Sequence, residues 1–88
     1  MTTPILPTVH LNGTGLKTLK ESYDRVDDAL YELQQAWGEV EFNARDYYPQ
    51  GPEAWDQATK ERGQHSKALL DLGVYLTAIR EHLHSIDQ

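Results

Sequence analysis

The residues best suited to bind a ligand cluster around a proline-rich segment in the middle of the chain. Arg45, Tyr47 and Tyr48 precede Pro-Gln-Gly-Pro, and Arg62 and His65 follow it. A planar guanidinium binds phosphate through paired hydrogen bonds, and aromatic rings stack on planar bases. These residue types predict a site for a small phosphorylated or nucleotide-like molecule, with the arginines on phosphate, the tyrosines as a platform and His65 as a hydrogen-bonding partner.

Each of these residues also has a purely structural interpretation. Arg62 and His65 interrupt an apolar stripe, where buried polar residues specify register or oligomer state. Arg62 can equally extend to Asp46, Asp56 or solvent. The tyrosines can cap the end of a helical bundle and form a protein interface. Both interpretations stay open at the level of sequence.

A second polar segment, His-Leu-Asn-Gly-Thr-Gly, lies near the N-terminus. Asn12, Thr14 and Lys17 resemble a small anion nest at a helix start, and they complete the predicted set of ligand-binding residues. An ordinary Asx turn with Thr14 as N-cap explains the segment equally well. In a hairpin it lies at the end opposite Arg45, so the two segments meet only if neighbouring hairpins pack antiparallel.

Catalytic and metal-binding patterns are weak. Ser22 and Ser66 lie within predicted helices, without the glycine pattern of a nucleophile elbow. His82 and His84 are two residues apart, so their side chains diverge by roughly 200° on a helix. The chain has no cysteine. We therefore expect a non-enzymatic protein without a metal or cofactor.

Two runs of apolar residues, spaced three and four apart, must position these side chains. One runs from Leu16 to Val40 and the other from Trp55 to Ile86. That spacing predicts helices that pack along a shallow seam. The expected architecture is all-α: one domain in the form of an antiparallel two-helix hairpin, with a N-terminal extension (1–13), helix 1 (14–43), a turn (44–51) and helix 2 (52–87).

The expected register follows from folding the chain about this turn. It pairs Leu16 with Ile79, Leu30 with His65, Leu33 with Arg62 and Val40 with Trp55. We also expect the N-terminal extension to cover the end of helix 2 through Ile5, Leu6, Val9 and Leu11. Apolar residues beside the second seam exceed what two helices can bury, which predicts a homo-oligomeric helical bundle; they are Leu70, Val74, Tyr75 and Ala78.

The net charge is −6, and eight acidic residues lie within residues 21–46. This balance disfavours direct nucleic-acid binding, which needs clustered Lys and Arg. Asp27 and Asp28 fit a solvated helix face; as an alternative function, such a face imitates nucleic acid and occupies a basic surface of a host protein. We expect a cytoplasmic protein without membrane contact, because the chain has neither an apolar run of ~20 residues nor a signal peptide.

The motifs His10–Gly15 and Arg45–Pro52 together resemble a group of small helical-hairpin proteins encoded by bacteriophages and prophages. The resemblance implies a phage accessory protein located in the host cytosol, and it brings no established activity. Phages also encode small helical oligomers that sequester nucleotide immune signals, which this chain is similar to in size and architecture alone. The leading hypothesis is a counter-defence protein that sequesters a nucleotide-like ligand; a structural coiled-coil element is a further alternative.

Overall fold

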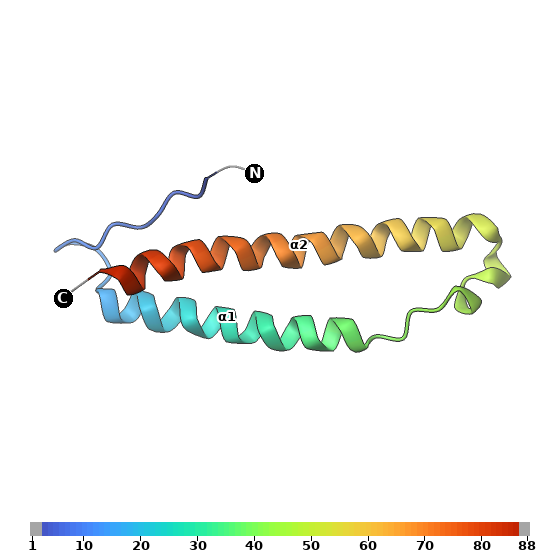
Figure 1. Ribbon diagram of the computed structural model, residues 1–88, viewed down its shortest axis with the longest axis horizontal. Helices are drawn as coiled ribbons and strands as arrows, with labels where there is room; N and C mark the ends of the chain where they lie inside the picture. Colours follow the sequence, from blue (N-terminus) through green and yellow to red (C-terminus); the bar gives the residue numbers. More distant parts are fainter. Residues whose placement is uncertain (1–2, 87–88) are drawn as a thin grey trace.

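The computed structural model describes residues 3–86 and consists of two long helices joined by a linker (Figure 1). Helix α1 spans Leu16–Glu39 and α2 spans Pro52–Ser85, with two short 3-10 helices between them, η1 (Ala44–Asp46) and η2 (Tyr48–Gln50). The long helices run antiparallel, and the N-terminal segment lies along the far end of α2. The predicted all-α hairpin is confirmed.

Helix α1 is shorter than the predicted range 14–43. It begins after Gly15, which has an extended backbone, and no side chain caps it, so the predicted N-cap role of Thr14 is wrong. It ends where Val40 turns extended (φ −62°, ψ 129°). The apolar period continues through Val40, but Phe42 leaves the helix and packs its ring 4.8 Å from that of Trp55.

Helix α2 begins as predicted, with Pro52 in the first turn and Glu53 beside the positive end of the helix. Gly51 precedes it with φ 109° and ψ 160°, a conformation that suits glycine almost alone. The helix ends at Ser85, since Ile86 is extended. Residue 87, the predicted end of this helix, lies outside the described residues.

The best-buried cluster lies at the end of the hairpin that carries the termini. Leu16, Ile79 and Leu83 form it, and partly buried Val9, Leu19, Tyr23 and Ile86 pack against it.

The N-terminal extension covers this cluster only in part. Val9 packs there as expected, and the His82 ring lies within hydrogen-bonding distance of the Pro7 carbonyl, at 2.8 Å. Ile5 and Leu11 are 91% and 97% exposed, so their predicted role as a cover is wrong.

Along the middle of the hairpin the register differs from the predicted one. Leu30 lies beside Gly73 rather than His65, and the Trp37 indole donates to the Ser66 hydroxyl at 2.9 Å. The reason is the linker, which runs beside the first turns of α2 (Figure 1). Linker residue Phe42 therefore takes the place beside Trp55 that the prediction gave to Val40.

The hairpin is long and thin, with extents of 60 × 25 × 19 Å. Within residues 3–86, neither helix combines the length and apolar character that crossing a bilayer demands.

Candidate functional site

Arg62 ties α2 to the last turn of α1. Its Nη2 donates to the Trp37 carbonyl at 3.0 Å, and its guanidinium carbon lies 4.6 Å from the Trp37 ring centroid and 4.9 Å from that of Phe42. The Trp37 carbonyl lies in the last turn of α1, where it also accepts from the Val40 backbone N–H at 3.3 Å. Arg62 thus helps to cap α1 and stacks on two aromatic rings, whereas one interpretation of the sequence had it extend to Asp46, Asp56 or solvent.

Three aromatic rings pack next to Arg62. Phe42 lies 5.7 Å from Tyr47 and 4.8 Å from Trp55, and Tyr47 and Trp55 are 5.7 Å apart. Such distances are typical of favourable edge and tilted ring contacts. We call Trp37, Phe42, Tyr47, Trp55 and Arg62 the linker-end cluster. Tyr47 and Arg62 were predicted at this end, whereas Phe42 was missed because its position continues the apparent helix.

A cavity of about 280 Å³ opens beside this cluster. It contains both signs of charge, since Glu41 and Glu61 line it together with Arg62 and His65. Its other walls come from Trp37, Val40, Phe42, Tyr47 and Ala58. The arrangement suits a small ligand that has a planar ring, hydrogen-bond donors for the carboxylates and an anionic group for the arginine.

The structure brings only part of the predicted site together. Tyr47, Arg62 and His65 line one cavity. Arg45 lies in η1 of the same end, and Tyr48 is 63% exposed in η2. The remaining predicted residues are exposed at the opposite end of the hairpin; they are Asn12, Thr14 and Lys17.

A charged network that the sequence analysis missed joins the helices nearer the termini. Arg80 Nε lies 2.8 Å from an Asp24 carboxylate oxygen, and Arg80 Nη1 lies 3.1 Å from one of Asp27. His84 Nε2 also lies 3.1 Å from Asp24. Hydrogen bonds from Arg80, and then from His84, hold the pKa of the Asp24 carboxyl below its usual 3.8. The carboxylate in turn raises the pKa of Arg80.

This network corrects the assignment of Asp27 to a solvated face. Its carboxylate is half-buried and paired with Arg80. Arg80 follows Leu76 by four residues, so it lies beside the buried stripe of α2, and this spacing was the available signal. Asp28 is exposed, as expected.

The histidines of α2 point to different partners, as their spacing predicts. His82 contacts the Pro7 carbonyl and His84 contacts Asp24. Among residues 3–86, His, Asp and Glu form no group of three or more placed to hold a metal ion.

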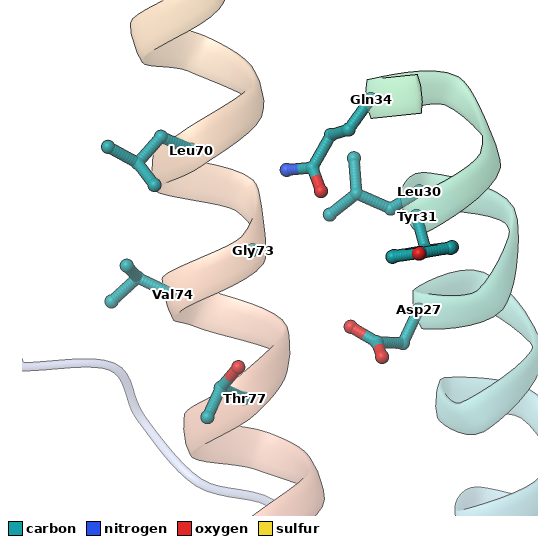
Figure 2. Close-up of a pocket in the computed structure, with 8 residues that line it drawn as sticks. All are labelled: Asp27, Leu30, Tyr31, Gln34, Leu70, Gly73, Val74 and Thr77. Carbon is teal, nitrogen blue, oxygen red and sulfur yellow. The ribbon is translucent and has the colours of Figure 1, made fainter. Parts of the chain in front are cut away.

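A second cavity, of about 390 Å³, lies between the helices at mid-length (Figure 2). Gly73 contributes only backbone to its wall, and Gln34 and Asp27 extend toward α2 from the other side. We call it the Gly73 groove; it is lined by Asp27, Leu30, Tyr31, Gln34, Leu70, Gly73, Val74 and Thr77.

No protein-family model, curated protein or solved structure matches this chain.

Proposed function

We propose that this chain is a non-enzymatic binding protein that acts as a homo-oligomer of hairpins and sequesters a small phosphorylated or nucleotide-like ligand at the linker end. The observation that carries the proposal is the cavity beside the linker-end cluster, where Arg62 and three aromatic walls meet two carboxylates. A guanidinium has five N–H donors, and one of those of Arg62 bonds Trp37, so other donors remain for an anionic group of the ligand.

The mixed charge of the cavity favours a nucleotide over a bare phosphate. Glu41 and Glu61 repel a free anion but accept hydrogen bonds from the amino group of a base. Exposed Tyr48 offers a stacking surface outside the cavity, and Arg45 adds a second positive charge at the same end. The proposed ligand would stack its base on Tyr48 and place its phosphate near Arg45.

The resemblance to phage-encoded hairpins supports a particular setting for this activity. A small protein that binds a nucleotide without transforming it lowers the free concentration of a signal. We therefore place the chain, within this proposal, among counter-defence proteins that act in the host cytosol.

The alternative, an acidic inhibitor that occupies a basic protein surface, loses support from the ion pairs. Asp24 and Asp27 contact Arg80, which neutralises part of the acidic segment of α1. Charges that are already paired steer a basic partner less strongly.

Tryptophan fluorescence tests the proposal directly, because Trp37 lines the cavity and Trp55 packs beside it. Adenosine monophosphate is the first probe, and adenosine and inorganic phosphate serve as its two separate halves. We expect saturable quenching by the nucleotide and weaker binding of each half.

Two variants locate the binding. Tyr48→Ala and Arg45→Ala change exposed residues of the linker end and should weaken nucleotide binding about tenfold or more. Lys60→Ala is the matched control, since it removes an exposed positive charge from α2. Equal affinity in all four proteins, or no quenching by any phosphorylated probe, contradicts the proposed ligand site.

A further inference from the structure

The floor of the Gly73 groove is backbone on the side of α2. A Cβ placed on Gly73 would lie 3.6 Å from Leu30 Cδ2 and 3.7 Å from Gln34 Nε2, which are ordinary contact distances. Leu30 and Gln34 thus leave room for a methyl group at Gly73, and the Gln34 amide donates to the Leu69 carbonyl at 3.5 Å beside it (Figure 2).

The rim of the groove is apolar and open to solvent. Leu70 is 63% exposed and Tyr31 62% exposed, with Val74 beside them. Figure 2 shows Leu70 and Val74 on the side of α2 away from α1. An exposed apolar patch of this kind marks an interaction surface.

The chain exposes more surface than a compact monomer of its mass, enough for an interface with a partner. The chain exposes 6931 Å², whereas a compact monomer of 10.1 kDa exposes about 5,300 Å². The excess of roughly 1,600 Å² is more than the ~800 Å² that each partner buries in a standard interface. The radius of gyration, 18.6 Å, likewise exceeds the ~12 Å of a compact chain of this length.

We propose that the Gly73 groove is the docking surface for a second copy of this chain, packed antiparallel about a two-fold axis, with Leu70 of each copy inserted beside Gly73 of the other. This inference rests on the proposed homo-oligomer and names its interface. The groove offers the pocket and its own rim offers the apolar side chain, so one surface is complementary to itself, as a two-fold interface requires.

Charge decides between the antiparallel and parallel arrangements. The pairing of Leu70 with Gly73 places residues near 64 of one α2 opposite Arg80 of the other. Exposed Lys60 and Lys67 then flank the partner's acidic segment, in which Asp28 is exposed while Asp24 and Asp27 are already paired with Arg80. A parallel pair would place each lysine opposite itself.

The same arrangement places the two ends of the hairpin together. The end of one copy that carries the termini lies beside the linker end of its partner. The cavity lined by Val40 and His65 opens on the face opposite the Gly73 groove, because these residues lie seven positions from Leu33 and Leu72. Asn12, Thr14 and Lys17 of the partner therefore do not line this cavity in the proposed pair.

Sedimentation equilibrium on matched variants tests the surface. Leu70→Glu adds a charge to the rim, and Gly73→Leu fills the groove; each should weaken self-association about tenfold or more. Tyr75→Glu is the control, because Tyr75 is half-exposed on the other side of α2. Circular dichroism checks that all three variants stay helical, and Leu70→Ala replaces Leu70→Glu if that variant unfolds.

The absence of cysteine makes the orientation testable by cross-linking. A mixture of Lys67→Cys and Thr77→Cys chains should form a mixed disulfide, because the antiparallel pair places these positions opposite each other. Disulfides formed within the Lys67→Cys protein alone would indicate a parallel pair and overturn the proposal.

These outcomes distinguish the proposed Gly73 groove interface from the proposed homo-oligomer. Self-association that is lost in Tyr75→Glu but retained in both groove variants overturns the Gly73 interface and leaves the homo-oligomer standing. A wild-type protein that is monomeric at every concentration overturns both. Neither result depends on the identity of the ligand.

Discussion

The Arg62 side chain holds the end of α1 against α2 through contacts of two kinds. It donates to the Trp37 carbonyl at 3.0 Å and stacks over the Trp37 and Phe42 rings. A hydrogen bond from a charged donor to a helix-end carbonyl stabilises a fold more than a neutral one. Its position in an apolar stripe is thus explained by contacts within one chain.

Arg62→Ala should lower the free energy of unfolding by about 1–3 kcal/mol, because it removes the cap and both ring contacts. Urea denaturation followed by circular dichroism measures the change. Arg62→Lys should recover only part of the loss, since an ammonium lacks the planar stack. Arg45→Ala, an exposed change at the same end, should alter stability by no more than about 0.5 kcal/mol; an equal loss in both alanine variants would contradict the assigned role.

The lowered pKa of the Asp24 carboxyl predicts how the stability of the fold depends on pH. Arg80 and His84 lower the pKa of its carboxyl below 3.8 in the folded chain. A group whose pKa is depressed by folding stabilises the fold above its unfolded pKa, and this contribution is lost as pH falls through the folded value. The melting temperature of the wild type should therefore fall more steeply below about pH 4 than that of Asp24→Asn.

Asp28→Asn is the matched control for this pH series. Asp28 is exposed on the same helix, so its removal should leave the acid limb of the profile unchanged. Superimposable profiles for the wild type and Asp24→Asn would show that the ion pair does not form in solution.

At the scale of the elements, the linker sets how the two helices meet. Gly51 adopts φ 109° at the start of α2, and Phe42 and Tyr47 pack on Trp55. The linker thereby covers the first turns of α2, which extend beyond the end of α1. The aromatic contacts also form the walls of the cavity at this end.

Gly51→Ala should destabilise the fold by about 1–3 kcal/mol, because residues with a Cβ are strained at this backbone conformation. Thermal unfolding followed by circular dichroism provides the comparison. Gly38→Ala, within α1 and with open space at its Cβ position, should instead stabilise the chain by about 0.5–1 kcal/mol. The interpretation fails if both substitutions shift stability in the same direction.

The existence and direction of both helices were predictable, whereas the end of α1 was not. Apolar periodicity reports which face of a helix is buried, and Val40 continues the period although its backbone is extended. The proline and glycine signals before α2 act through the backbone itself, so its start at Pro52 was predicted correctly.

The candidate site could likewise be predicted only in part from the sequence. Tyr47, Arg62 and His65 were expected near one another and line one cavity. The residues of α1 that lie opposite Arg62 and His65 were predicted wrongly. The register depends on the path of the linker, and no local spacing in the sequence encodes that path. The ion pairs of Arg80 were missed for the same reason, because Asp24 and Asp27 are distant in sequence.

At the scale of the whole molecule, the proposed association with other copies would add burial to an elongated hairpin that has a small core. Only six hydrophobic residues are buried among those that the structure describes: Leu16, Leu30, Ala58, Leu76, Ile79 and Leu83. Half-exposed apolar residues also lie on the side of the hairpin away from the groove, among them Val26, Leu33, Leu72 and Tyr75. Association through the Gly73 groove raises the apolar burial of each chain.

Association coupled to folding makes thermal stability depend on concentration. For a dimer of this size, the melting temperature should rise by roughly 3–5 °C per tenfold increase in protein concentration. Scanning calorimetry over two decades of concentration measures the slope. A melting temperature independent of concentration would indicate that the hairpin folds and persists alone.

Native mass spectrometry of the purified protein, without added ligand, tests the central claim most directly, because it reports subunit number and retained small molecules together. We predict an even-numbered homo-oligomer that carries additional mass, which is released on denaturation. A bare monomer at all concentrations, without additional mass, would contradict both the proposed homo-oligomer and the proposed retention of a ligand.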